Sequence, residues 1–236
     1  MILVHNLKKS FGRLCVLTGL NLTVEPGAVT LLVGSNGAGK TTALRLMAGL
    51  SVADAGTITL AGYNLERDRA AALARCSFLP QAPRFHPRLT VRQVTEFYAR
   101  LRGHQCETAA FALKTWGMDP FENVPTGKLS GGLRQRLALA IFSLADAPVL
   151  LLDEPGLSLD PEWRECLQQF LRKEALRGCT VLVATHLLGE WEGRADRCLL
   201  VEDGRSQGEL PPDKLREYFP RLGRKMSEGI PLELCA

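Results

Sequence analysis

Eight consecutive residues near the start of the chain have the types and the spacing of a loop that binds phosphate, matching GxxxxGK[ST] at every fixed position. Glycines let main-chain N–H groups curl around phosphate oxygens, and the following helix turns its positive end toward the same charge. We expect Lys40 to reach the β- and γ-phosphates of a nucleotide and the Thr41 hydroxyl to bind Mg²⁺. A flexible glycine-rich turn would leave the Lys-Thr pair unexplained. The residues predicted to contact the nucleotide here are Gly34, Ser35, Asn36, Gly37, Ala38, Gly39, Lys40, Thr41 and Thr42.

Two adjacent carboxylates, Asp153 and Glu154, directly follow the apolar run Val149–Leu152. In a parallel sheet, ligands bind at the ends of such strands. We expect Asp153 to bind Mg²⁺ through water and Glu154 to polarise the water that attacks the γ-phosphate. A solvated acidic turn is the alternative, and the phosphate loop elsewhere in the chain makes it the weaker one.

A serine and two glycines, Ser130, Gly131 and Gly132, open an apolar helix. Their hydroxyl and main-chain N–H groups would form a surface for an anion. An ordinary helix cap made by Ser130 explains the same residues. Taken alone, this segment leaves both interpretations open.

Alternating strand and helix patterns must position these residues. Val29–Val33 is a compact apolar run, typical of a strand buried on both faces. Apolar residues at helical spacing in Val91–Leu101 and Glu107–Trp116 predict a helical subdomain over about residues 88–145. The alternation predicts an α/β fold with a mostly parallel sheet. The other expected elements are strands at Ile2–Leu7, Leu14–Val24, Thr57–Leu60, Val149–Leu152, Thr180–Ala184 and Cys198–Glu202, helices at Lys40–Gly49 and Pro161–Arg177, and a turn at Asp203-Gly204.

Length and composition limit the function classes. The 236 residues suggest one domain over 1–236, with a tail from about 207 to 236 that contains one short helix at Lys214–Tyr218. A net charge of +4 is too small to indicate nucleic acid as a partner. The longest apolar run, Leu137–Ala145, is well short of the roughly 20 residues that span a bilayer. With no signal-peptide pattern in Met1–Ser10, we expect a cytoplasmic chain. The seven cysteines show no CxxC spacing, so no zinc or redox site is expected.

Taken in order, the motifs resemble the ATP-binding cassette family, the nucleotide-binding subunits of ABC transporters. They are GSNGAGKT, a glutamine after a strand, LSGG, LLLDEP, SLDP and a histidine, and the resemblance covers about residues 2–205. It implies a P-loop NTPase core, with a mostly parallel sheet, an N-terminal antiparallel β-subdomain and a helical subdomain. The chain departs from the family at Leu133, where Gln is common after LSGG, and at Gly156, where Thr usually follows Asp-Glu-Pro.

The resemblance also implies roles for five further residues. Phe11 stands where the family stacks an aromatic ring on adenine, with a plain apolar contact as the alternative. Gln81 matches the glutamine that contacts Mg²⁺ or the attacking water and relays movement to the membrane subunit. His186 matches the histidine that contacts the γ-phosphate. Ser158 and Asp160 match residues that touch the partner subunit.

The family implies a head-to-tail pair of cassettes, expected here as a homodimer that uses ATP and Mg²⁺. Lys40 would bind ATP on one chain, and Ser130, Gly131 and Gly132 of the other would cover its γ-phosphate. A separate multi-spanning subunit would hold the chain at the cytoplasmic face of the inner membrane. The segment Phe11–Thr23 and the Leu-Arg-Gln-Arg after LSGG look nearer to bacterial export-type cassettes.

Two alternatives remain for the function. Non-transport relatives that act on nucleic acid or the ribosome typically carry two cassettes, a long coiled-coil insertion or zinc modules, and this sequence contains none of these. A P-loop kinase or GTPase would leave the LSGG segment unexplained.

Overall fold

Three neighbouring strands form the centre of the larger sheet, and every one of their residues is buried: β3 (Val29–Val33), β7 (Val149–Asp153) and β8 (Thr180–Ala184). Alternate side chains of these strands enter two different hydrophobic cores. In β7, for example, Leu150 and Leu152 face one core, while Val149 and Leu151 face the other. The computed structural model describes residues 1–212. The predicted helix Lys214–Tyr218 and the rest of the proposed tail after 212 lie outside this range.

The larger sheet has six strands in the order β10-β9-β3-β8-β7-β6. All neighbouring pairs from β9 to β6 are parallel, and only β10 runs antiparallel to its neighbour β9. The mostly parallel sheet that the alternation predicts is therefore confirmed. The outer strands are β6 (Cys76–Leu79), β9 (Arg197–Glu202) and β10 (Arg205–Leu210).

A second sheet of four antiparallel strands has the order β2-β1-β4-β5. Helix α1 (Lys40–Met47) lies between the two sheets, and its buried side chains share a core with both. The N-terminal antiparallel sheet is thus confirmed as well. Its strands are β1 (Ile2–Phe11), β2 (Leu14–Val24), β4 (Ala55–Leu60) and β5 (Tyr63–Asn64).

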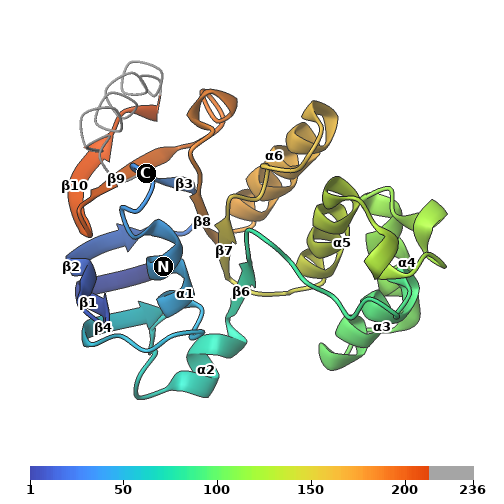
Figure 1. Ribbon diagram of the computed structural model, residues 1–236, viewed down its shortest axis with the longest axis horizontal. Helices are drawn as coiled ribbons and strands as arrows, with labels where there is room; N and C mark the ends of the chain where they lie inside the picture. Colours follow the sequence, from blue (N-terminus) through green and yellow to red (C-terminus); the bar gives the residue numbers. More distant parts are fainter. Residues whose placement is uncertain (213–236) are drawn as a thin grey trace, which may run out of the picture.

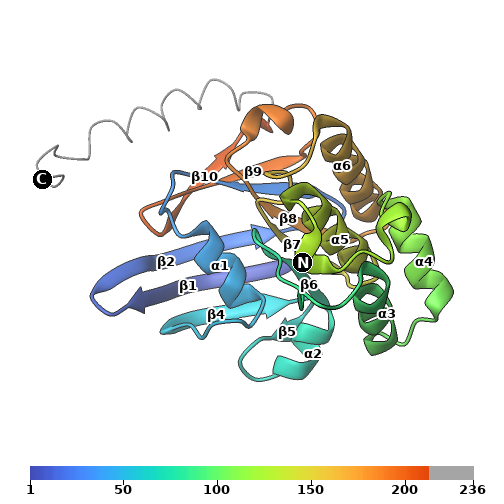
Figure 2. The ribbon, with the colours of Figure 1, turned by 45° about the vertical axis from the view of Figure 1, so that its right-hand side comes forward.

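Three helices gather on one side of the sheets: α3 (Val91–Leu101), α4 (Cys106–Thr115) and α5 (Gly131–Ser143) (Figures 1 and 2). Helix α3 begins with a capping box in which Thr90 and Gln93 satisfy each other's main-chain N–H groups. Short 3-10 turns at Asp119–Phe121 (η1) and Thr126–Lys128 (η2) connect α4 to α5. Helix α6 (Pro161–Leu176) lies between this group and the sheet edge formed by β9 and β10 (Figure 1). The boundaries of the helical subdomain at 88 and 145 remain a prediction.

Several elements differ from the sequence expectation. Strand β1 continues four residues beyond Leu7, to Phe11. Helix α1 ends at Met47, because Gly49 turns the chain with a φ of 68°. Helix α2 (Arg69–Ala74) and strand β5 were not expected, and β10 takes in residues 207–210 of the predicted tail. The expected turn at Asp203-Gly204 is confirmed, and it joins β9 to β10.

Candidate nucleotide-binding site

The glycine-rich loop joins the end of β3 to the start of α1, and two of its glycines are required by its shape. Gly34 has a φ of 156°, and a Cβ there would meet the carbonyl oxygen of Val201 at 2.0 Å. Gly39 is the N-cap of α1 with a φ of 100°, and a Cβ there would meet Leu17 at 2.6 Å. The loop therefore packs closely against both sheets, with Gly34 next to β9 and Gly39 next to β2, and a side chain at either position would collide with them.

Lys40 is the first residue of α1, and only 8% of it is exposed. Its Nζ donates hydrogen bonds to the carbonyls of Gly34 at 2.9 Å and Ser35 at 3.0 Å. Burial lowers the pKa of Lys40, and the nearby carboxylates of Glu154 and Asp153 oppose that shift. The side chain thus spans the glycine-rich loop and holds a positive charge there, where phosphates would bind.

Asp153 ends β7 beside the same loop. The Thr41 hydroxyl donates to its Oδ1 at 3.1 Å, and Asp153 is 2% exposed. Burial raises the pKa of Asp153 and Glu154 adds to the effect, while the Thr41 hydrogen bond and Lys40 act against it. A bound cation would favour the ionised carboxylate, so hydroxyl and carboxylate together form a hard-oxygen donor pair.

Glu154 follows Asp153 in a conformation that is uncommon for a non-glycine residue, with a φ of 48°. Its N–H donates to the carbonyl of Ala184 at 2.8 Å. One carboxylate oxygen lies 2.8 Å from Nδ1 of His186, and the other accepts a weaker bond of 3.3 Å from the His186 main-chain N–H. The carboxylate of Glu154 therefore lies against the loop that follows β8.

These side chains meet on one cavity of about 500 Å³. Nine of the residues predicted from the sequence line it, including Gln81, which is far from the glycine-rich loop in the sequence, whereas Asp153 does not line it. Gly34, Ser35 and Ala38 lie in the loop behind the lining residues. The cavity is lined by Leu14, Val16, Asn36, Gly37, Gly39, Lys40, Thr41, Thr42, Gln81, Glu154 and His186.

Phe11 does not line this cavity. It ends β1 with 53% of its surface exposed, and the Lys9 ammonium lies 5.3 Å from its ring centroid. Leu14 and Val16, on the next strand, line the cavity instead. They are two residues apart, and alternate residues of a strand point to the same face. The sequence could therefore have predicted that Leu14 and Val16 share one face of β2. The stacking of Phe11 on adenine remains a prediction.

The serine and glycines of the LSGG segment are also outside the cavity. Ser130 is the N-cap of α5, and its Oγ accepts a hydrogen bond from the N–H of Leu133 at 3.2 Å. Within one chain, the helix-cap interpretation therefore holds. A Cβ at Gly132 would meet the carbonyl oxygen of Ser158 at 2.9 Å, so the start of α5 packs closely on the segment before α6. Ser158 and Asp160 are both exposed.

One residue that sequence reasoning missed supports the main chain after Glu154. Gln135, on α5, is 3% exposed, and its Nε2 donates to the carbonyl of Pro155 at 3.0 Å. It thereby ties the helix that begins at Ser130 to the peptide that follows Glu154. No signal in the sequence marked this role, because Gln135 stands between Arg134 and Arg136 and its acceptor is a main-chain carbonyl.

Comparison with known proteins points to one family. The sequence pattern of the family described as "ABC transporter" matches residues 17–156. "Nod factor export ATP-binding protein I" of Burkholderia lata is 37% identical over 217 residues, covering 90% of this chain and 71% of that protein. The protein of the same name from a Rhizobium species is 34% identical over 236 residues, with coverage of 97% and 77%.

Solved structures agree with this result. The ATP-binding cassette MJ0796, a dimer in a post-hydrolysis state bound to ADP and Pi, superposes with a TM-score of 0.81 and 25% identity. The match covers 90% of this chain and 99% of that one. An ATP-binding subunit of an ABC transporter superposes with a TM-score of 0.84 at 23% identity, covering 96% and 99%, and supports the fold.

Proposed function

Because this chain belongs to the ABC transporter family, we propose that it is one half of a paired motor in which two copies hydrolyse ATP head to tail. As an ATP-binding subunit of this family, it hydrolyses ATP to drive transport. The observation that carries our assignment of the site is the meeting of Lys40, Glu154 and His186 on one cavity. These residues come from three separate segments of the chain, and each has a distinct part in phosphoryl transfer to water.

In this proposal, Lys40 and the N-terminal end of α1 neutralise the phosphates. Glu154 takes the proton of the attacking water while the water oxygen bonds to the γ-phosphorus and the bond to the ADP oxygen breaks. His186, held by Glu154 at 2.8 Å, contacts the γ-phosphate. Gln81 lines the same cavity, from which it would contact Mg²⁺ or the attacking water. Catalysis then comes from positioning and electrostatics rather than from covalent chemistry.

We propose that Thr41 and Asp153 hold Mg²⁺. Their oxygens are the hard donors that Mg²⁺ prefers, and the ion normally completes its shell with water and substrate phosphates. Within residues 1–212, no cluster of three or more His, Cys, Asp or Glu side chains forms an all-protein metal cage, which fits an ion shared with a nucleotide. When bound, Mg²⁺ would supply positive charge against the β- and γ-phosphate oxygens.

Chelation tests this assignment. We expect excess EDTA to reduce ATP hydrolysis to background, and added MgCl₂ to restore it. The variant T41A should need more Mg²⁺ for half-maximal turnover, because it loses one of the proposed protein donors. T108A is the matched control, since Thr108 lies on α4, away from the cavity. Turnover that persists in EDTA, or an unchanged Mg²⁺ requirement in T41A, would contradict the assignment.

The second cassette completes the site in this proposal. Ser130 does not line the cavity of its own chain, so its contact with the γ-phosphate requires another copy. The dimeric cassette structures to which this chain is similar support such a pair. Ser158 and Asp160 are exposed, and Ser158 adjoins the start of α5, so a partner can reach both residues.

A separate multi-spanning subunit is the other proposed partner. Within residues 1–212, no helix is long and apolar enough to cross a membrane. The relatives named for Nod factor export support export as the direction of transport. We place the chain at the cytoplasmic face of the inner membrane, bound through that subunit. In this proposal, the membrane subunit selects the substrate.

Affinity purification from native membranes tests this function. We expect a tagged copy of the chain to bring down a multi-spanning protein, while the tag alone brings down none. Ribosomal proteins or nucleic acid, with no membrane protein, would instead support a non-transport ATPase. Salt-sensitive RNA binding by the purified chain would support the same alternative.

A further inference from the structure

The linker between β7 and α6, residues 155–160, is held from two sides by side chains. Gln135 of α5 donates to the carbonyl of Pro155 at 3.0 Å. Arg164, in the first turn of α6, donates from Nε to the next carbonyl, that of Gly156, at 3.2 Å. Two successive peptide groups after Glu154 are therefore fixed, one toward each neighbouring helix.

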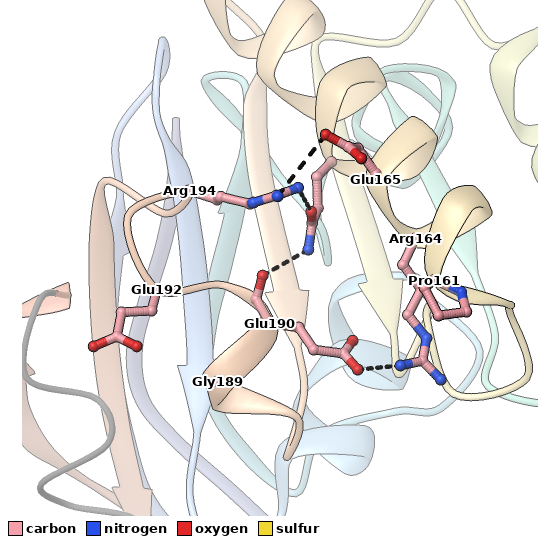
Figure 3. Close-up of a pocket in the computed structure, with 8 residues that line it drawn as sticks. Pro161, Arg164, Glu165, Gly189, Glu190, Glu192 and Arg194 are labelled. Carbon is pink, nitrogen blue, oxygen red and sulfur yellow. Dashed lines mark hydrogen bonds and ion pairs between the residues drawn. The ribbon is translucent and has the colours of Figure 1, made fainter.

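The same guanidinium reaches a second loop. Nη1 of Arg164 pairs with the carboxylate of Glu190 in the short turn Leu188–Glu190 (η3), and the two side chains, which line the same cavity, point toward each other (Figure 3). Gln168, one turn further along α6, donates to the Glu190 carbonyl at 2.8 Å. Glu190 is only four residues after His186. Arg164 thus joins the linker after Glu154 to the loop that carries His186.

The two side chains that bind the linker, Gln135 and Arg164, differ in how deeply they are buried. Gln135 is 3% exposed, so it belongs to the packed interior. The side chains of Arg164 and Glu190 are 30% and 28% exposed, and they border a solvent-open cavity of about 440 Å³. Ion pairs this exposed contribute little to the free energy of unfolding. What the pair does fix is the position of one loop relative to the other.

We propose that Arg164 is a positioning residue, which links the linker that faces the second cassette to the loop that carries His186. When the partner contacts Ser158 and Asp160, it fixes the position of the linker. Through the bonds from Arg164 to Gly156 and Glu190, the linker then fixes the loop of His186. His186 is thereby held in position beside Glu154. This rests on the proposed function, because the signal begins at the interface between two cassettes. Gly156 adds to the case, since a side chain there would lie against Arg164 and Glu190 at 3.7–3.8 Å.

The test is steady-state ATP hydrolysis by R164Q, E190Q and the double variant. We expect kcat to fall about 10- to 100-fold in R164Q, with the KM for ATP unchanged, because Arg164 does not line the ATP cavity. E190Q should behave alike, and the double variant should lose no more than either single one, since the two groups act as a unit. R164K, which keeps the charge but not the two-pronged contact, should lie between wild type and R164Q.

R172Q is the matched control. Arg172 lies on the same helix and pairs with Asp196 at 2.6 Å, away from the linker, so its kcat should stay at the wild-type value. ATP-dependent dimerisation of R164Q, measured in the E154Q background, should also be retained. Unchanged kcat in R164Q, additive losses in the double variant, or loss of the dimer would each overturn the proposal. Wild-type turnover in the same assay reports on the proposed function independently.

Discussion

Glu154→Gln should bind ATP normally yet hydrolyse it about 10²- to 10⁴-fold more slowly, the contribution that a positioned general base usually makes. The amide has the shape of the carboxylate and can still accept a hydrogen bond from His186, so the geometry at 2.8 Å should survive. Only the ability of the Glu154 carboxylate to take a proton from water is lost. Single-turnover hydrolysis of labelled ATP separates this loss from any change in binding.

The same variant should accumulate as an ATP-bound dimer. In the proposed mechanism, two cassettes close on ATP and reopen after hydrolysis, so a block at the chemical step should hold the closed pair. Size-exclusion chromatography with MgATP should show the dimer for E154Q and much less of it for wild type. E96Q is the matched control, because Glu96 is also an ion-paired glutamate, bonded to Arg100 on α3. Full hydrolysis by E154Q would remove Glu154 from the role of base.

The parts of the fold that were predictable are those with the strongest burial pattern. Strands β3, β7 and β8 are apolar and buried on both faces, so their limits were found to within one residue. Strand β10 was missed because most of its residues are exposed and Gly208 interrupts it. Its pairing with β9 is a tertiary contact at the edge of the sheet. Helix α2, with one buried residue, gave no periodic signal either.

The residues of the candidate site also differ in how far the sequence could predict them. Lys40, Asp153 and Glu154 could be predicted as site residues because contiguous motifs contain them. Gln135 and Arg164 could not, because each acts through a carbonyl of the linker after Glu154, Pro155 or Gly156. Every residue has a main-chain carbonyl, so the sequence does not show which carbonyl a side chain will bind. These two contacts also join residues that are 20 and 8 positions apart. Only the fold brings such donors to their acceptors.

Lys40→Ala should weaken ATP binding about 10- to 100-fold, since a hydrogen-bonded charge pair is worth about 1.5–3 kcal/mol. The measurement is calorimetric titration in the E154Q background, where hydrolysis does not interfere. K114A serves as the control, because Lys114 is exposed on α4 and does not line the cavity. Unchanged affinity in K40A would count against the glycine-rich loop as the phosphate site.

Thermal unfolding of K40A separates binding from folding. Burial lowers the pKa of Lys40, so the ammonium is held in the folded chain at a desolvation cost that its two carbonyl contacts and the nearby carboxylates partly offset. Removing it should leave the Tm of the nucleotide-free chain close to that of wild type. The rise in Tm that MgATP produces should shrink, because that rise scales with the logarithm of the ratio of ligand concentration to Kd. A large fall in the nucleotide-free Tm would instead make Lys40 a structural residue of the loop.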